Sequence, residues 1–500
     1  MGTFFPAGRL EVHRRPDHRR AAPSSPAQET PPVTTPSPLL PLDGPFELLT
    51  PTVTHRDGRS VVRLPYRIGS SAGPLLMTEE VELPVTLADS DHARVAVRLL
   101  HLLAGVSYYK CVVPTPLVVP ALSDAERALL EGIYDHGLRE LAHRHGLPVP
   151  VPVELREQAG AITPVIEPGG GPEPMAGSVP PLIPVGGGKD SALVASLVPD
   201  GLLFAVNPVG AQHRLAAALD RPLLAATRRM DPVLRELVAA GVTNGHVPVT
   251  AITSAVAVLT AVAMGASEVI MGIERSADEP SLIDADGHPV NHQWSKSSAA
   301  EALLGAAFAP TGVSWFSLLR PLTELAIGAA VAARGLAPHI VSCNRVFTVW
   351  NESDASRNQR ACGECAKCLF TALMLAPAST PAAVAEQYGG NLLDRRDHIE
   401  AVRDLWSDVK PFDCVGERHE SAAAVVLLAR LAGWRDHQVI AALESEARAL
   451  LESDGRRAED FLVVEAPDVL PAAYRDRVVA LADDIDAALG VRAEDRRAPR

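Results

Sequence analysis

Short apolar runs alternate with helical patterns through the middle of the chain. The runs predict buried strands over 182–185, 202–206, 223–226 and 268–272. Between them, apolar residues recur at helical spacing over 211–219, 231–240 and 251–266. Repeated strand–helix pairs predict a parallel sheet with right-handed crossovers, and ligands are expected at the carboxyl ends of its strands.

The pattern before this region is of another kind. Alternating apolar and polar residues predict strands joined by hairpins over 46–49, 60–64 and 77–85. Helical patterns follow over 93–103 and 125–145. We therefore expect an N-terminal α+β domain over 46–166, which we interpret as a substrate-recognition domain.

Composition sets the remaining boundaries. Residues 1–45 are rich in Pro and Arg with little apolar periodicity, which predicts a disordered tail, and the Pro/Gly-rich residues 167–180 predict a linker. The sheet domain then spans 181–376 and is expected to be catalytic. Residues 377–500 predict a helical C-terminal region, with helices over 382–387, 395–409, 422–431, 437–451 and 472–489.

The overall composition excludes several classes of protein. The 500 residues carry a formal net charge of -14, which argues against a general nucleic-acid binder. Six cysteines, four of them clustered, do not fit a secreted disulfide scaffold. The longest apolar run, 251–266, is shorter than a membrane span, and no signal-peptide pattern opens the chain. We expect a soluble cytoplasmic protein with neither nucleic acid nor membrane as a partner.

One stretch carries the strongest chemical signal. Gly186, Gly187 and Gly188 follow the strand at 182–185, and Asp190 and Ser191 precede an apolar helix. Consecutive glycines allow positive φ and let a bulky anion approach the main chain. The polar pair can cap a helix whose free N–H groups and dipole face that anion. This order predicts a phosphate-binding loop, although a glycine-rich turn without a ligand would have the same sequence.

The spacing of this loop matches neither GxxxxGK[ST] nor GxGxxG. It resembles the SGGxDS loop of the PP-loop ATP pyrophosphatases, with Gly186 in place of the usual Ser. That resemblance implies an adenine nucleotide α-hydrolase-like sheet in which the loop, Gly186 to Gly188 with Asp190 and Ser191, binds ATP. Asn207, just beyond the strand at 202–206, is a candidate contact for adenine or ribose.

Charged residues follow another predicted strand end. Glu274 and Asp278 come just after 268–272 and are candidates for holding Mg²⁺ against nucleotide phosphates. Arg275 is a candidate clamp for a carboxylate or phosphate. An exposed loop with paired charges is the alternative interpretation.

The run from Asn291 to Lys296 consists of side chains that can hydrogen-bond. His292 or Lys296 would serve as a general base if burial or neighbouring cations lowered its pKa. Asn291 and Ser295 are candidate substrate contacts. A structural histidine is the simpler alternative.

Tyr108, Tyr109 and Lys110 place two aromatic hydroxyls beside an ammonium group. Such a cluster suits a sugar, nucleotide or carboxylate, so these residues are candidate substrate contacts. Partly buried structural tyrosines would give the same pattern.

Cysteines form the second strong cluster, with the spacing C-x18-C-x2-C-x2-C at Cys343, Cys362, Cys365 and Cys368. Four thiolates in a cytosolic chain fit a tetrahedral structural Zn²⁺. An iron–sulfur cluster is the alternative ligand.

These stretches, together with 412–420, resemble the MurL family of bacterial UDP-N-acetylmuramoyl-L-alanyl-L-glutamate epimerases, from about Tyr108 to Glu420. The resemblance implies ATP-dependent inversion of the terminal L-Glu of UDP-MurNAc-L-Ala-L-Glu in peptidoglycan precursor synthesis. An acyl adenylate would form, with release of AMP and diphosphate. Asp190 would act in that step, and Lys189 with Mg²⁺ would offset the charge of the leaving diphosphate.

The resemblance does not say which groups move the proton. His292 and Lys296 are candidates by their chemistry. Cys111 and Cys414 are a further candidate, as a thiol pair of the sort seen in cofactor-independent amino-acid racemases, although unpaired cysteines are usually core residues.

Two other functions fit the same loop. Another PP-loop adenylating enzyme, such as a deazaguanine nitrile synthase or a tRNA-thiolating enzyme, can carry Cys-x2-Cys metal sites, although the acidic balance disfavours tRNA. A non-catalytic nucleotide-binding protein is the third alternative.

Overall fold

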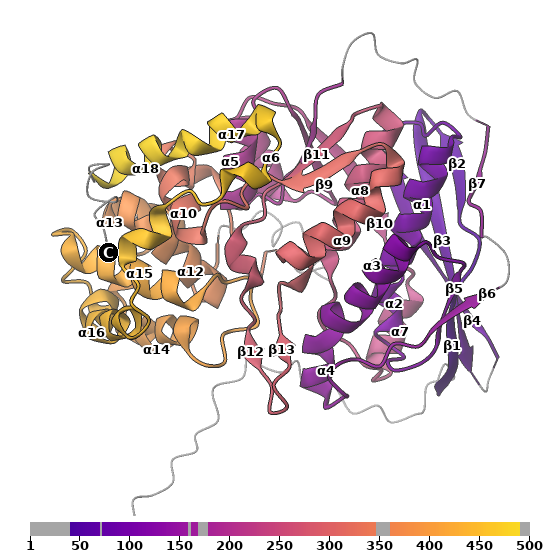
Figure 1. Ribbon diagram of the computed structural model, residues 1–500, viewed down its shortest axis with the longest axis horizontal. Helices are drawn as coiled ribbons and strands as arrows, with labels where there is room; N and C mark the ends of the chain where they lie inside the picture. Colours follow the sequence, from indigo (N-terminus) through magenta and orange to yellow (C-terminus); the bar gives the residue numbers. More distant parts are fainter. Residues whose placement is uncertain (1–40, 71–72, 159–161, 169–178, 347–360, 491–500) are drawn as a thin grey trace, which may run out of the picture. The chain divides into compact units, whose positions relative to one another are not determined.

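The computed structural model describes residues 41–70, 73–158, 162–168, 179–346 and 361–490. Within them, a mixed twelve-stranded sheet is flanked by helices (Figure 1). Its main path has the strand order β14-β11-β8-β9-β10-β4-β3-β1-β5-β6, and β2 and β7 attach beside β3. The protein is therefore a mixed α/β structure built on one large sheet.

Five neighbouring strands of this sheet are parallel: β8 (Leu182–Pro184), β9 (Leu202–Val206), β10 (Leu223–Arg229), β11 (Glu268–Met271) and β14 (Ser314–Ser317). This confirms the predicted parallel sheet. The chain runs outward from β8 to β9 and β10, then returns to the other side of β8 for β11 and β14. Open α/β sheets bind ligands outside the carboxyl ends of the strands at such a switch point.

Helices cover both faces of the parallel strands. Successive residues of a strand point to opposite faces, so Ile183 joins one hydrophobic core and Leu182 joins the other. The first core contains residues of α5 (Lys189–Leu197), α6 (Gly210–Ala218) and α10 (Glu324–Ala333). The second contains residues of α1 (Asp91–Ala104), α3 (Asp124–Asp135), α8 (Val249–Met264) and α9 (Ser298–Phe308).

Helix α8 shows why the longest apolar run is a core helix. It packs against β8, β9 and β11 on one side and against α1 on the other. A helix enclosed in this way is apolar on most of its circumference. Within the part of the chain that the structure describes, no helix is both long and apolar enough to cross a membrane.

The N-terminal half of the sheet is largely antiparallel. Its strands are β1 (Leu42–Leu48), β2 (Thr52–Arg56), β3 (Arg59–Ser70), β4 (Leu75–Leu83), β5 (Leu117–Pro120), β6 (Leu155–Gln158) and β7 (Val165–Ile166). Strand β4 pairs antiparallel with β10, where Val81 lies opposite Arg228. The sheet thus crosses the boundary expected between 46–166 and 181–376, and the described residues form one compact unit.

The structure describes the predicted tail, residues 1–45, and the predicted linker, residues 167–180, only in part. Strand β1 begins at Leu42, inside the range predicted as a tail, because Phe46 and Leu48 are buried against β3 and β5. Residues 1–40 lie outside the described residues, as do 169–178 of the predicted linker.

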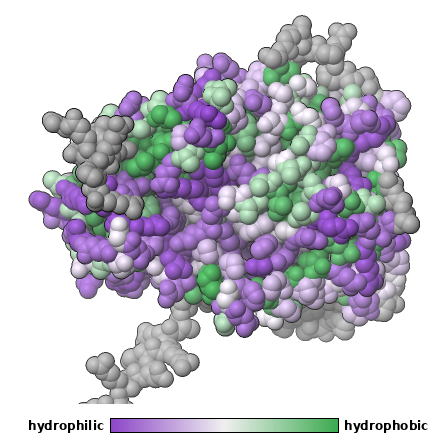
Figure 2. All heavy atoms as spheres, viewed as in Figure 1, coloured by the Kyte–Doolittle hydropathy of each residue, from purple (hydrophilic) through white to green (hydrophobic). Residues whose placement is uncertain are grey.

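The described part of the predicted C-terminal region is helical, as expected, but the bounds of several helices differ from the prediction. Its α-helices are α13 (Pro381–Tyr388), α14 (Ile399–Arg403), α15 (Arg418–Arg430), α16 (Gln438–Ser453), α17 (Ala472–Val479) and α18 (Leu481–Leu489). The single helices predicted over 395–409 and 472–489 are each broken into shorter segments. Figure 2 shows hydrophilic side chains over most of the described part of one face, with hydrophobic groups in separate patches.

Candidate active site

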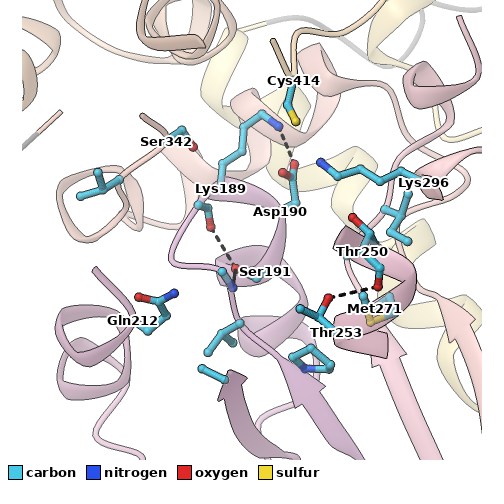
Figure 3. Close-up of a pocket in the computed structure, with 18 of the residues that line it drawn as sticks. Lys189, Asp190, Ser191, Gln212, Thr250, Thr253, Met271, Lys296, Ser342 and Cys414 are labelled. Carbon is cyan, nitrogen blue, oxygen red and sulfur yellow. Dashed lines mark hydrogen bonds and ion pairs between the residues drawn. The ribbon is translucent and has the colours of Figure 1, made fainter. Parts of the chain in front are cut away.

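A cavity of about 360 Å³ lies at the switch point. It is lined by the glycine loop after β8, the ends of β9 and β11, the first turns of α8, residues 341–344, α12 (Ala366–Leu375) and Cys414. Figure 3 shows the side chains of Lys189, Asp190, Lys296 and Cys414 directed toward one another in this space. The structure therefore brings the glycine loop, Lys296 and Cys414 into one place.

The glycine loop has the backbone expected of an anion cradle. Gly187 adopts φ +82°, and a Cβ there would lie 2.8 Å from the Ala211 Cβ. Gly188 is the N-cap of α5, so the free N–H groups of that helix face the cavity. The Ser191 hydroxyl donates to the Gly188 carbonyl at 3.3 Å and accepts from the Gly186 N–H at 3.2 Å.

Asn207 is placed differently from its prediction. Its side chain donates to the Arg228 carbonyl and accepts from the Arg228 N–H, each at 2.8 Å. It is not among the residues that line the cavity, although its neighbour Val206 is. Its amide therefore links β9 to β10 instead of facing the cavity.

Three carboxylates surround Lys189, which is buried. Its ammonium lies 2.5 Å from Asp190 Oδ1 and also pairs with Glu324. One oxygen from each of Asp190, Glu274 and Glu324 lies within 4.8 Å of the others. Burial raises the pKa of Glu274 and the charge of Asp190 raises it further. Among the described residues, Glu274 Oε1 has no hydrogen-bond partner.

The structure does not bring the predicted magnesium pair together, because Asp278 is not in the carboxylate cluster that contains Glu274. Asp278 is exposed, and its Oδ1 accepts from the Ser298 N–H at 2.6 Å, where it helps to begin α9. Glu324, which the sequence patterns did not single out, takes its place beside Glu274. Arg275 pairs with Glu465 and does not line the cavity, so the structure gives no support to a clamp there.

Neither residue predicted as a general base has the lowered pKa that this role requires. Burial lowers the pKa of His292, but Cys414 and Glu140 outweigh it and raise the pKa to about 9. Burial likewise opposes the charge of Lys296, yet Cys414, Glu274 and Asp190 raise its pKa above the ordinary value. Both side chains are therefore cations at neutral pH, which corrects the prediction of a basic His292 or Lys296.

Cys414 has the opposite character. Burial alone would raise the pKa of its thiol, but Lys296, Lys367 and His292 hold the pKa well below its usual value. Cys111, the other member of the predicted thiol pair, lies in the hydrophobic core and not in the cavity. Burial raises the pKa of Cys111 to about 11. The two cysteines therefore do not form a pair.

Tyr108, Tyr109 and Lys110 are core residues. Tyr108 and Tyr109 are 0% exposed, and the Tyr109 hydroxyl donates to the Thr115 carbonyl at 2.7 Å. The Tyr108 hydroxyl accepts from the Asp231 N–H at 2.9 Å. Because the two tyrosine hydroxyls are bonded within the protein and all three side chains are buried outside the cavity lining, the prediction of substrate contacts is replaced by the structural alternative.

Asn291 and Ser295 also have structural surroundings. The Asn291 amide donates to the Ala277 carbonyl at 2.9 Å, and its oxygen accepts from the Gln293 N–H at 2.7 Å. Ser295 is buried in the short helix η3 (Trp294–Lys296). Neither lines the cavity; their segment instead positions Lys296, which does.

The four clustered cysteines come together as predicted. One Sγ atom from each lies within 4.8 Å of the others, and the Sγ of Cys368 is 3.8 Å from that of Cys362 and 3.5 Å from that of Cys365. A tetrahedral Zn²⁺ with Zn–S bonds of about 2.3 Å spaces its sulfurs about 3.8 Å apart. The donor set therefore fits a single ion. An iron–sulfur cluster would need room for several atoms between the thiolates and fits less well.

The fold and the cavity define an α/β protein with a phosphate-type glycine loop, a carboxylate cluster and a low-pKa thiol at one switch point. Comparison with known families is more specific. The model of the MurL N-terminal domain matches residues 46–318, and that of the MurL C-terminal domain matches residues 339–458. The chain belongs to the MurL family.

Three curated relatives share most of their length with this chain. A protein of Salinispora tropica is 39% identical over 84% of this chain and 92% of its own length. A protein of a Micromonospora species is 41% identical over 76% of this chain and 86% of its own length. A protein of Xanthomonas oryzae pv. oryzae is 36% identical over 79% of this chain and 87% of its own length. Each is named UDP-N-acetyl-alpha-D-muramoyl-L-alanyl-L-glutamate epimerase. No solved structure matches the chain.

Proposed function

We propose that this protein is an ATP-dependent epimerase that converts the terminal L-Glu of UDP-MurNAc-L-Ala-L-Glu to D-Glu in peptidoglycan precursor synthesis. Family membership and the names of three relatives with high coverage support the substrate and the stereochemical change. The observation that carries the proposal is that one cavity is lined by both the glycine loop and the Cys414 thiol.

The chemistry explains why inversion at this carbon would consume a nucleotide. The Cα proton next to a carboxylate is hard to remove, because the carbanion would lie beside an existing negative charge. Transfer of AMP to the carboxylate removes that charge and leaves an acyl group that can accept the electron pair. The acyl adenylate is then hydrolysed after inversion, so the net products are D-glutamyl product, AMP and diphosphate.

The residues of the loop have clear roles in the adenylation step. The N–H groups at the start of α5 would hold phosphate oxygens, with Gly187 allowing the close approach. Lys189 would offset the charge that develops on the leaving diphosphate. Its two carboxylate partners keep its ammonium at the floor of the cavity.

The carboxylate cluster is the proposed Mg²⁺ site. One oxygen from each of the three carboxylates lies within 4.8 Å of the others, and the pKa of Glu274 is raised first by burial and then by the charge of Asp190. Oxygen donors with excess negative charge are what Mg²⁺ prefers. When bound by Asp190, Glu274 and Glu324, Mg²⁺ would neutralise phosphate charge.

The four cysteines are the proposed structural Zn²⁺ site. Two neighbouring segments reach the cavity: Ser342 and Asn344 flank Cys343, and Lys367 lies between Cys365 and Cys368. Bound Zn²⁺ would fix these segments to each other. The site would therefore hold Lys367 at the cavity wall without contact with the substrate.

Incubation with UDP-MurNAc-L-Ala-L-Glu, ATP and Mg²⁺ in deuterium oxide tests the function. We expect AMP, diphosphate and a D-glutamyl product labelled at Cα, and no nucleotide cleavage in Asp190→Ala. AMP without Cα label would favour another adenylating enzyme. Nucleotide binding without AMP would favour a non-catalytic protein, and unchanged diphosphate release by Asp190→Ala would contradict the assignment of the loop.

A further inference from the structure

Cys414 is held at the cavity by a well-anchored loop. The loop precedes α15 and is fastened at the two residues that follow the cysteine. The Gln293 amide donates to the Val415 carbonyl at 2.8 Å, and the buried Lys410 ammonium donates to the Gly416 carbonyl at 2.9 Å. Because these bonds fix its main chain, the thiol has a defined position beside Lys296 (Figure 3).

Cations from three separate segments converge on this sulfur. Lys296 comes from η3 and Lys367 from α12, and both line the same cavity as the thiol. His292 is the third cation and acts as a hydrogen-bond partner of Cys414. Against the effect of burial, these charges hold the pKa of the thiol well below its usual value, which favours the thiolate form.

The imidazole itself is oriented by a buried carboxylate. His292 Nδ1 lies 2.5 Å from Glu140 Oε2 on helix α4 (Arg139–His145). Glu140 is buried, and Arg144 one turn along the helix also pairs with it at 2.8 Å. With Nδ1 engaged in this way, Nε2 is the ring nitrogen left for Cys414. Glu140 and His292 are thus positioning residues for the thiolate.

The other titratable residues that line the cavity are less suited to accept a proton from carbon. Lys189 is ion-paired with Asp190 and Glu324, and the pKa of Lys296 is raised above its ordinary value by Cys414, Glu274 and Asp190 against the effect of burial. Asp190 and Glu324 are paired with Lys189 and belong to the carboxylate cluster. Among the described residues lining the cavity, Cys414 is the anion that this cluster leaves free.

We propose that Cys414 is the catalytic base that removes the Cα proton of the adenylated glutamyl group. This inference rests on the proposed function and adds to it the residue that performs the inversion. It uses one thiolate, not a pair of thiols.

The step balances without an added oxidant or cofactor. A lone pair of the Cys414 thiolate takes the Cα proton, and the C–H electron pair passes into the acyl group to form an enolate. The neighbouring Lys296 ammonium stabilises the developing oxygen charge. Water then delivers a proton to the opposite face of Cα, and the thiol returns its proton to water. The D-glutamyl product therefore carries a hydrogen from solvent.

The test compares Cys414→Ser and Cys414→Ala with Cys111→Ala in deuterium oxide, with three readouts: diphosphate release, Cα deuterium and the D-glutamyl fraction. General bases contribute roughly 10²–10⁴-fold, so we expect both Cys414 variants to lose at least about 100-fold in Cα label while diphosphate release persists. Cys111→Ala should keep both, because Cys111 lies in the core away from the cavity.

The outcomes separate the two proposals. Wild-type protein that releases no diphosphate would sink the proposed function. If wild type releases diphosphate and either Cys414 variant keeps Cα labelling within about tenfold of it, Cys414 is not the base, because a lost base costs more. A folded Cys414→Ser that also loses diphosphate release would place the residue in adenylation and overturn the inference. Thermal melting of each variant establishes folding, and the serine variant decides if the alanine variant does not fold.

Discussion

Two buried charged networks lie along the same sheet, one between β4 and β10 and the other at the ends of β8 and β11. In the first, Glu79 is 0% exposed and receives Arg228 Nε at 2.7 Å and Nη2 at 2.9 Å. Arg228 Nη2 also donates to the Ser107 hydroxyl at 2.8 Å. In the second, two carboxylates share Lys189 and Glu274 keeps an oxygen with no partner among the described residues.

The difference in bonding distinguishes a network that only stabilises the fold from one that can bind a ligand. A buried carboxylate with both oxygens bonded by one guanidinium has no capacity for a ligand. A cluster beside a cavity that has more carboxylate oxygens than hydrogen-bond donors can still bind a ligand. The sequence offered polar residues in both places, Tyr108 to Lys110 near the first network and Asp190 near the second, and only the bonding distinguishes them.

The closed network should be needed for stability and not for catalysis. Arg228→Met should lower the free energy of unfolding by about 3–5 kcal/mol, because it leaves Glu79 buried and unpaired. The control is Arg229→Met, whose guanidinium is 55% exposed and reaches Glu82 at 3.3 Å, with an expected loss below about 1 kcal/mol. Urea unfolding measures both. Equal losses in the free energy of unfolding for the two variants would mean that the buried, fully bonded ion pair contributes no more to stability than the exposed one.

The open site should contain a thiolate that persists as the pH falls. Since the pKa of Cys414 is well below its usual value, its alkylation by iodoacetamide should change little between about pH 8.5 and about pH 6.5. An ordinary thiol with a pKa of about 8.5 should slow roughly 50-fold over that interval. Site-resolved mass spectrometry, with glutathione in the same tube, gives both rates. A decrease as large as that of glutathione would contradict the thiolate.

Two glycines of the loop should respond differently to a side chain. Gly187→Ala should lower diphosphate release at least about tenfold, because a Cβ at φ +82° is strained and would meet Ala211. Gly186→Ser should leave the rate within about twofold, since nothing lies within 4 Å of a Cβ there. The measurement is initial diphosphate release at saturating ATP. Comparable losses in both variants would show that the turn at Gly187 is not the critical constraint.

The smallest expected effect concerns the carboxylate that lacks a partner. Glu274→Gln should raise the Mg²⁺ concentration needed for half-maximal diphosphate release by about tenfold, through loss of one charged donor. The free energy of unfolding should change by less than about 0.5 kcal/mol, because removal of the charge also relieves its repulsion from Asp190. Asp278→Asn is the matched control and should leave the Mg²⁺ requirement unchanged, since Asp278 only begins α9.

Features carried by local patterns were predictable. The glycine loop, the apolar runs of four of the five parallel strands and the C-x2-C-x2-C run depend on residues close together in sequence. One helix start also follows a local pattern: the Thr380 side chain accepts from the Ala383 N–H, with Pro381 in the first turn of α13.

Glu324 and Lys367 show where such patterns end. Each lies on a helix whose spacing indicates only a buried face, and no neighbouring residue suggests a nucleotide. They become site residues because Glu324 at the start of α10 and Lys367 at the start of α12 both line the cavity that the glycine loop lines. A Glu one position after a cap, as Glu324 follows Thr323, is ordinarily only a favourable first-turn residue.

The sequence by itself determined most of the elements and the chemical inventory of this protein: a glycine-rich loop, four clustered cysteines and a set of titratable side chains. The tertiary structure alone decided which of them act together and in which protonation state. The physical reason is that a pKa and a site depend on charges brought together from distant segments. The pKa of Cys414 is lowered only where Lys296, Lys367 and His292 meet the thiol, and Tyr108 loses its predicted role only because it is enclosed.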